Sequence, residues 1–240
     1  MLSEKAFEAL YLPARTARLE GRYRTAIVLC TEILERYALT ARQQSVLLEM
    51  RGICYTGIKA KERAESDLQR ALTFAVDAGL VHEQAHVLTS VVRLRLVQGR
   101  HHAAAETILP RARQVLLGLN DHESMVLRAS IHGLYGVIRF RDGRPVKAFQ
   151  ELQKAETILR EYPDDVRMLR NVRRMAYLLC WYGRRSDARF YAVRIRQLAQ
   201  RITENGDPRS LRLSTYITFC TWVPFPSKWL LRPMRRASGL

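Results

Sequence analysis

The chain has 240 residues, enough for one large domain or two small ones, and 48% of them are hydrophobic, which excludes an intrinsically disordered protein. Only 12 glycines and 8 prolines are present, so long helices joined by short turns fit better than a β protein with many turns. The net charge is +17, with 34 arginines and 6 lysines, and such a surface would attract an acidic protein, nucleic acid or anionic lipid. A GC-rich genome would produce the same arginine excess without any function.

The cysteines and the N-terminus favour a cytoplasmic protein. The four cysteines lie far apart in apolar contexts without a C-x-x-C pair, which predicts buried free thiols at Cys30, Cys54, Cys180 and Cys220. Glu4, Lys5 and Glu8 interrupt any apolar run that a signal peptide would need. The longest uncharged apolar stretch, residues 213–227, is too short to span a bilayer, so no integral membrane segment is expected.

A repeat of about 40 residues runs through the chain. In each unit an alanine is followed four residues later by a second small or apolar residue, and three residues after that by a third. The five sets are Ala26/Cys30/Ile33, Ala64/Leu68/Ala71, Ala104/Ile108/Arg111, Ala148/Leu152/Ala155 and Ala188/Ala192/Ile195, and Arg111 is the exception to the apolar pattern. A glycine stands five residues before four of the alanines, at Gly21, Gly99, Gly143 and Gly183, whereas Gly57 stands seven residues before Ala64.

The sequence pattern of each repeat predicts two antiparallel helices. The glycine allows a left-handed backbone at the turn after the first helix. The small alanine near the start of the second helix lets the two helix axes approach closely, and the following spacing gives that helix one apolar stripe. Since a single pair cannot bury this stripe alone, neighbouring pairs must stack.

Several segments resemble tetratricopeptide repeats, among them GICYTGIKAKERAESDLQRALTFAVDAG and GLYGVIRFRDGRPVKAFQELQKAETIL. They match the family's G-x-x-Y pattern (Gly52, Tyr55) and its G-x4-A-x3-[FL]-x2-A pattern, although the usual first-helix Trp is absent. The period exceeds the usual 34 residues, which is similar to the long repeats in sensor regions of bacterial transcription regulators. The resemblance covers roughly residues 5–203 and implies a fold more specifically than a function.

In chain order we expect an all-α protein, a right-handed solenoid of about five antiparallel helix pairs with a C-terminal capping helix. The predicted pairs cover about 5–36, 43–78, 82–118, 122–161 and 165–204. The corresponding division is a repeat domain at 1–207, a capping helix at 208–223 that begins at Pro208, and a basic irregular tail at 224–240.

One motif is typical of a zinc peptidase, which is a remote alternative for this chain. His82-Glu83-Gln84-Ala85-His86 matches H-E-x-x-H, in which two histidines one helical turn apart bind zinc and the glutamate is the general base of a peptidase. Glu106 follows at a spacing similar to that of the third ligand in thermolysin-like enzymes. The repeat register, however, places His86 and Glu106 near opposite ends of one helix pair. Because no phosphate loop, nucleophile elbow or paired C-x-x-C occurs either, we expect no enzyme, no bound metal and no cofactor.

The resemblance also implies a binding surface, since the first helix of each tetratricopeptide pair lines a concave groove. Carrying over these positions gives Arg15, Arg18, Glu49, His86, Arg93, Arg141, Arg170, Arg173 and Tyr177. Arginine dominates this set, and guanidinium groups bind carboxylates and phosphates through paired hydrogen bonds. The expected function is therefore a non-catalytic adaptor, chaperone or regulatory subunit that binds an acidic segment of a protein partner in this groove, although arginine is also simply abundant on the surface.

Two alternatives remain open. Residues 139–212 are rich in basic residues, and aromatic residues stand near Arg185 and Arg189, so this half could bind nucleic acid or serve as a sensor module of a transcription regulator. In a solenoid such aromatics are more often core residues. The C-terminal helix is apolar on much of its circumference and could pair with a partner or with a second copy of the chain.

Overall fold

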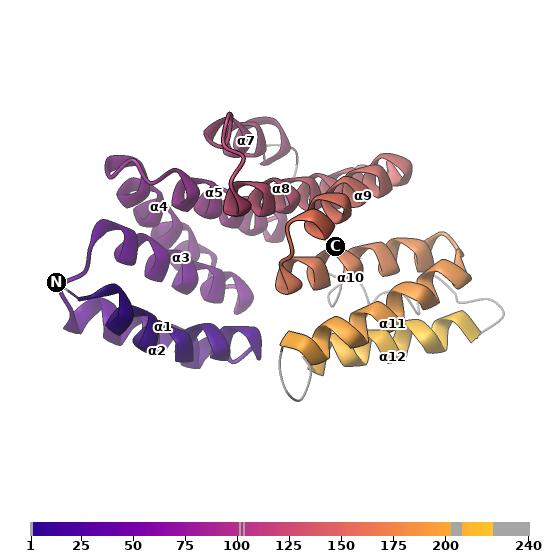
Figure 1. Cartoon of the computed structure of the whole chain (residues 1–240), viewed down its shortest axis with the longest axis horizontal. Helices are drawn as coiled ribbons and strands as arrows, with labels where there is room; N and C mark the ends of the chain where they lie inside the picture. The colour runs from indigo at the N-terminus through magenta and orange to yellow at the C-terminus, as the bar shows by residue number, and fades with distance from the viewer. Residues whose placement is uncertain (1, 101, 103, 203–207, 223–240) are drawn as a thin grey trace. The chain divides into compact units, whose positions relative to one another are not determined.

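The computed structural model describes residues 2–100, 102, 104–202 and 208–222, and all the regular structure in this part of the chain is helical (Figure 1). The helices are α1 (Glu4–Leu19), α2 (Tyr23–Arg36), α3 (Ala41–Gly57), α4 (Lys61–Asp77), α5 (Val81–Val97), the π-helix η1 (Ala104–Ile108), α7 (Leu109–Val115), α8 (His122–Arg141), α9 (Pro145–Glu161), α10 (Asp165–Trp181), α11 (Arg185–Ile202) and α12 (Pro208–Trp222). The predicted all-α class with five helix pairs is confirmed.

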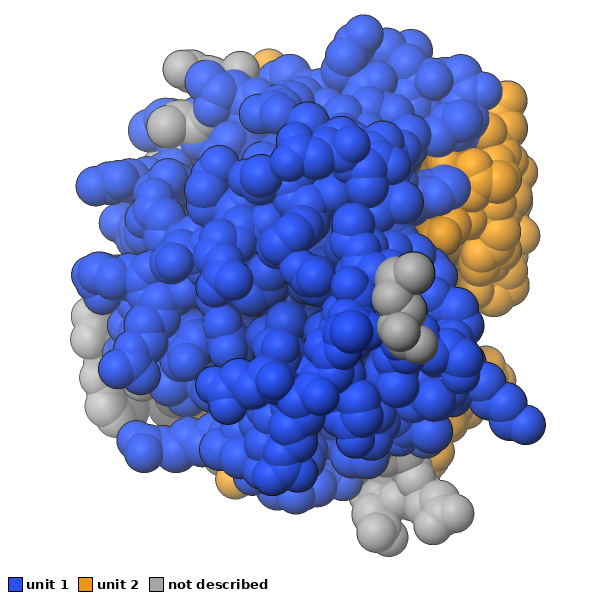
Figure 2. Space-filling view, turned by 90° about the vertical axis from the view of Figure 1, so that its left-hand side faces the viewer, with its two compact units in different colours: residues 1–119 blue, residues 120–240 orange. Residues whose placement is uncertain are grey.

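The chain forms two compact units, residues 1–119 and 120–240, which Figure 2 shows in blue and orange. Unit 1 holds the pairs α1/α2 and α3/α4 and a third pair in which η1 and α7 pack against α5. Its core includes a cluster of buried apolar side chains at Phe7, Ala14, Cys30, Ile33, Leu47 and Met50. Unit 2 holds the pairs α8/α9 and α10/α11, followed by α12. Its core cluster comprises Ala148, Leu152, Met175 and Leu178.

Side-chain caps begin several first helices in the segments between the predicted pairs. Thr40 and Gln43 form a reciprocal capping box at the start of α3. Asp121 accepts a hydrogen bond from the Ser124 backbone N–H at the start of α8, and Asp164 caps α10 in the same way. These caps satisfy backbone donors that a helix N-terminus leaves without partners.

The repeat alanines lie at buried positions within the pairs. All five are fully buried, at Ala26, Ala64, Ala104, Ala148 and Ala188. Gly52 and Gly136 lie opposite two of them, because a Cβ on Gly52 would fall 3.4 Å from the Ala64 carbonyl oxygen and one on Gly136 would fall 3.2 Å from that of Ala148. Small residues on both helices therefore set the close approach, as the sequence predicts.

The exception at Arg111 has a structural cause. Ala104 opens η1, and the additional residue in this π-turn shifts the apolar stripe by one position. The fully buried side chains are Leu109, Ala112 and Leu116, while Arg111 is exposed. The expected set Ala104/Ile108/Arg111 is therefore wrong beyond its first residue. The third repeat also buries an apolar stripe, but its residues stand one position later in the sequence than in the other repeats.

Left-handed residues end the first helices as predicted, with one correction. Gly21, Gly99, Gly143 and Gly183 have φ between 72° and 81°. In the second repeat the equivalent position belongs to Lys59, with φ of 64°, and not to Gly57. Gly57 is needed for a different reason, since a Cβ there would lie 2.7 Å from the Tyr23 ring.

The segment after the last pair contains α12, which begins at Pro208 as predicted and packs on α11 and α10. Leu213 and Ile217 are buried, whereas Arg212 and Thr215 are exposed, so the described outward side is polar instead of apolar. The predicted tail at 224–240 and the Asp207 cap lie outside the described residues. The division at 207 and 223, and the right-handed stacking, stay predictions. No helix in the described ranges is long and apolar enough to cross a membrane.

Candidate ligand-binding face

The predicted groove residues fall into two sets, one in each unit. Arg15 and Arg18 lie on α1, Glu49 on α3, and His86 and Arg93 on α5. The second set is Arg141 on α8 and Arg170, Arg173 and Tyr177 on α10. Since α3 packs beside α1 and α5, and α10 beside α8, each set lies on neighbouring first helices of its own unit.

In unit 1 hydrogen bonds join two first helices, α3 and α5, through one polar row. The Ser90 hydroxyl on α5 donates to the Glu49 carboxylate on α3 over 2.6 Å, and the Arg93 Nη1 donates to the Ser90 hydroxyl over 3.2 Å. Burial raises the pKa of Tyr11 on α1, and Glu49 raises it further, while Arg18 and Arg15 lower it. Charges from α1 and α3 therefore act on one phenol.

The remaining residues of this row differ in exposure. Arg15 is exposed, while Arg18, Glu49, His86 and Arg93 are half-buried. The Arg18 Nε is buried and has no hydrogen-bond partner among the described residues. A buried donor without an acceptor costs roughly 1–3 kcal/mol, so this row would gain from an acceptor supplied by a ligand.

Tyr177 does not belong to a binding surface. It is 1% exposed and meets Phe140 edge-to-face at 5.7 Å between ring centroids, with Trp181 at 6.1 Å. The prediction of Tyr177 as a groove residue is therefore corrected: this ring is part of the core between α8 and α10.

In unit 2 the two neighbouring first helices are strongly basic, and their acidic residues, Glu123 and Asp165, lie in the first turns. Residues 124–141 of α8 and 166–181 of α10 contain no Asp or Glu. They contain seven arginines, at Arg128, Arg139, Arg141, Arg167, Arg170, Arg173 and Arg174. Arg141, Arg170 and Arg173 are half-buried. Asp142 pairs with Arg139 and Asp164 with Arg167, and the net charge of these stretches stays positive, which favours an anionic ligand.

Arg174 is the most unusual member of this group. It is 5% exposed, and its Nε has no hydrogen-bond partner among the described residues. Burial, together with the charges of Arg170 and Arg173, lowers the pKa of Arg174 to about 9. Buried arginines are normally paired, because an unpaired buried charge is costly.

Three carboxylates of this unit, those of Glu156, Asp164 and Glu151, pair with groups other than Arg174. Glu156 accepts from Arg160 over 2.8 Å, from Arg194 and from the Tyr191 hydroxyl over 2.9 Å. Asp164 binds Arg167 in the first turn of α10, and Glu151 of α9 accepts from Lys154 over 2.8 Å and lies 2.7 Å from His132 Nδ1. Arg174 shares in none of these pairs.

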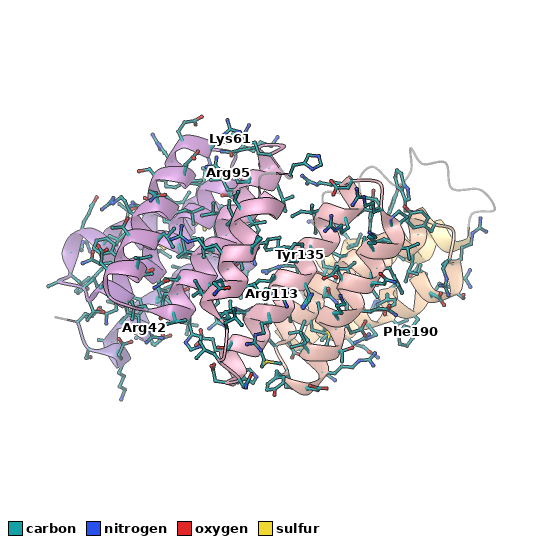
Figure 3. All side chains as sticks on the ribbon, turned by 90° about the horizontal axis from the view of Figure 1, so that it is seen from above. Arg42, Lys61, Arg95, Arg113, Tyr135 and Phe190 are labelled. Carbon is teal, nitrogen blue, oxygen red and sulfur yellow. The ribbon has the colours of Figure 1, made fainter. Side chains whose placement is uncertain are left out.

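The H-E-x-x-H motif lies on α5, but its glutamate has a structural role. The Glu83 carboxylate accepts from the Arg42 Nε on α3 over 2.7 Å, and Arg42 is labelled in Figure 3. Gln84 donates to the Ala75 carbonyl oxygen. Within the described ranges no three His, Cys, Asp or Glu residues are grouped so that they could hold a metal ion, and the side chain of Glu106 lies outside them.

The basic and aromatic stretch of α11 is largely engaged within the protein. Tyr191 is half-buried and bonded to Glu156, and the Arg194 guanidinium lies 5.7 Å from the ring centroid of Phe190 and 5.5 Å from that of Tyr191. Phe190, which is labelled in Figure 3, is 59% exposed. A row of stacking rings of the kind that holds single-stranded bases is therefore not formed by these residues.

Arg174 was not predicted as a site residue, although the sequence contains the signal. It stands fourteen positions before the repeat alanine Ala188, where Met50 and Leu134 stand before theirs. Met50 and Leu134 are buried core residues. An arginine at a core position of the repeat register indicates a buried charge, which is typical of functional sites.

Comparisons with known proteins support the fold. No protein-family model matches the chain, and no curated protein sequence matches it. A crystal structure of Rap protein complexed with Competence and Sporulation Factor is similar over 98% of this chain and 65% of that chain, with a TM-score of 0.72 and 16% identity. BtubC (BKLC) from P. vanneervenii is similar over 92% of this chain and 82% of that chain, with a TM-score of 0.53 and 15% identity.

These neighbours have a helical-repeat fold in common with this chain, and identities this low extend the likeness to the fold alone. The chain spans slightly less than two thirds of the length of the Rap protein. The helical-repeat class that the sequence predicts is thus supported, while membership of the tetratricopeptide family itself stays a prediction.

Proposed function

We propose that this protein is a non-catalytic interaction module that binds an acidic segment of a protein partner on the first helices of its repeats. The observation that carries the proposal is the absence of any carboxylate along residues 124–141 and 166–181, which together carry seven arginines. Such a surface would bind a carboxylate-bearing chain through charge-assisted hydrogen bonds.

The comparison with Rap protein adds to this proposal. There a related fold is complexed with Competence and Sporulation Factor, so helical repeats of this kind hold a second molecule. A protein ligand is favoured over nucleic acid because Arg174 is 5% exposed and Arg18 and Arg93 are half-buried. Single carboxylates can reach such groups, whereas a phosphate backbone requires a row of accessible cations.

The test uses a fluorescein-labelled hexaglutamate peptide, hexaglutamine as its uncharged counterpart, and a labelled single-stranded oligonucleotide. Arg93, Arg141 and Arg173 are changed together to Glu. The matched control changes Arg70, Arg113 and Arg196 to Glu; these three are exposed on second helices, and the net charge changes equally. Circular dichroism checks that both variants keep their helical content.

Fluorescence anisotropy should show hexaglutamate bound to the wild type at least about tenfold tighter than to the first-helix variant, as two or three lost charged contacts predict. The control variant should stay within about twofold of the wild type. Equal losses in both variants would reduce the effect to net charge and contradict the proposal. Tighter binding of the oligonucleotide, with hexaglutamate unable to compete, would instead support the nucleic-acid alternative.

A further inference from the structure

Arg174 and Gly133 occupy, in unit 2, the same pair of repeat positions as Ser90 and Glu49 in unit 1. Ser90 and Arg174 each stand fourteen positions before their repeat alanines, Ala104 and Ala188. Glu49 and Gly133 each stand fifteen positions before Ala64 and Ala148. The two pairs also meet across first helices in the same way, since Ser90 of α5 contacts Glu49 of α3, and Arg174 of α10 reaches Gly133 of α8.

The chemistry at these equivalent positions differs. In unit 1 a carboxylate is present and receives a hydrogen bond of 2.6 Å from the Ser90 hydroxyl. In unit 2 the residue that would supply the carboxylate is a glycine, and the residue that faces it is a guanidinium. A Cβ on Gly133 would lie 2.7 Å from the Arg174 Nη1, so the guanidinium lies directly over the residue that lacks a side chain.

Two buried polar atoms at this place have no hydrogen-bond partner among the described residues, the Arg174 Nε and the Asn171 Oδ1. The Asn171 amide nitrogen donates to the Leu152 carbonyl oxygen over 2.9 Å, which fixes the orientation of this side chain. The Asn171 Oδ1 would lie 3.7 Å from a Cβ on Gly133, on the same side as Arg174. Buried polar groups without partners are rare, and a missing ligand group is one explanation for them.

We propose that Arg174 binds a carboxylate of the protein partner over Gly133, at the position where unit 1 has its own Glu49. This inference rests on the proposed function, because it assigns the residue that anchors the acidic segment. The nearest charged groups on α10, Arg170 and Arg173, are positive and favour the same ligand. Arg173 stands fifteen positions before Ala188, so it follows Glu49 and Gly133 on the same face of the repeats. An anionic side chain that enters between them would pair the buried guanidinium and replace the carboxylate that the chain lacks.

The experiment supplies that carboxylate from within the chain. Gly133→Glu places an acid beside Arg174, and Gly133→Gln adds a side chain of the same size without the charge. The one atom that the added Cβ meets too closely is the Arg174 Nη1 at 2.7 Å, at the flexible end of the side chain, while the Asn171 Oδ1 at 3.7 Å is at ordinary contact distance. Arg174→Met removes the cation and introduces the residue that unit 1 has at this register position, Met50.

We expect hexaglutamate to bind Gly133→Glu at least about tenfold more weakly than Gly133→Gln, since the internal acid competes for Arg174. Arg174→Met should lose affinity to a similar extent. Equal affinities of the two Gly133 variants, or unchanged affinity of Arg174→Met, overturn the inference while leaving the proposed function intact.

A second measurement decides the case in which hexaglutamate fails to bind the wild type, which would reject the proposed function. Thermal unfolding of Gly133→Glu and Gly133→Gln is compared in the presence of Arg174 and again with Arg174→Met. If Arg174 is a cation that lacks its carboxylate, the glutamate should raise Tm relative to glutamine only when Arg174 is present. A Tm difference that does not depend on Arg174 rejects the site as well.

Discussion

Lys59 has a left-handed backbone, with φ of 64°, at a turn where four other repeats have glycine. A side chain in this conformation costs about 1–2 kcal/mol, whereas glycine adopts it freely but loses more entropy on folding. We therefore expect Lys59→Gly to stabilise unit 1 by about 0.5–1 kcal/mol, measured by urea unfolding.

The opposite change, Gly143→Ala, should destabilise unit 2 by about 1 kcal/mol. This loss comes from backbone strain alone, because a Cβ at this position meets no atom within 4 Å. A loss of stability in Lys59→Gly would contradict this account of the turn.

Glu156 joins α9 to α11 from an almost fully buried position, 4% exposed, and accepts from Arg194, Tyr191 and Arg160. Burial alone would raise the pKa of the Glu156 carboxyl, but the hydrogen bonds from Arg194 and Tyr191 outweigh burial, so its pKa lies below the ordinary value. Glu156→Gln should cost about 2 kcal/mol at pH 7, since it leaves the Arg194 charge without its partner.

The pH dependence of this loss follows from the direction of the pKa shift. A carboxyl with a lowered pKa in the folded state contributes stability above its unfolded pKa, about 4.3, and loses it as the pH falls through the folded value. The difference in unfolding free energy between wild type and Glu156→Gln should therefore shrink below about pH 4. Glu161→Gln, at an exposed position of the same helix, should show neither effect. A difference in unfolding free energy that stays constant down to pH 3 would contradict the lowered pKa of Glu156.

At the scale of the elements, the repeat alanines and their turns predict the helices closely. The predicted pairs and the observed helices differ by three residues at most at any end. This succeeds because apolar spacing, small residues and turn residues are local features of the sequence. The register of η1 and the burial of Tyr177 depend on which helices pack against each other, which local spacing does not specify. Local spacing assigned the groove residues to first helices. It did not predict how exposed these residues are or which partners they contact.

The π-turn in the third repeat can be tested by removing its additional residue. Without Thr107, Leu109 and Ala112 would stand four and seven positions after Ala104, the spacing of the other repeats. Pro110 would then lie inside a continuous helix, where it lacks a donor and costs about 3 kcal/mol.

We expect deletion of Thr107 alone to destabilise unit 1 by about 3 kcal/mol, and deletion combined with Pro110→Ala to restore most of that stability. Pro110→Ala without the deletion is the control, and it should change the unfolding free energy by less than about 1 kcal/mol because the buried side chains keep the register. If the combined variant is as unstable as the deletion alone, the packing does not tolerate the usual spacing and the explanation fails.

The helix α12 closes the last pair. Leu213 and Ile217 are buried against α11 and α10, and the Ser214 hydroxyl donates to the Ala192 carbonyl oxygen over 2.8 Å. Deletion of residues 208–240 should expose this apolar contact and lower Tm or cause aggregation, since a solenoid end needs a cap. Deletion of residues 225–240 alone should leave the fold intact and change association only. Scanning calorimetry and size-exclusion chromatography measure both; a monodisperse fragment 1–207 with wild-type Tm would contradict the capping role.

At the scale of the whole molecule, the division into two units has a consequence for folding. Each unit has its own buried cluster, around Leu47 and Met50 in unit 1 and around Leu152 and Met175 in unit 2. Compact units with separate cores can fold independently, and helical repeats depend mainly on their nearest neighbours. The fragments 1–119 and 120–240 should therefore each be helical by circular dichroism and unfold cooperatively on heating.

A cut inside one unit, at the loop after Asp77, is the control, because it leaves the fragment 1–77 without the α5 pair that packs on α4. This fragment should unfold at a lower temperature than fragment 1–119. If neither unit folds without the other while the whole chain unfolds in one transition, the two cores form a single cooperative structure and the division has no thermodynamic meaning.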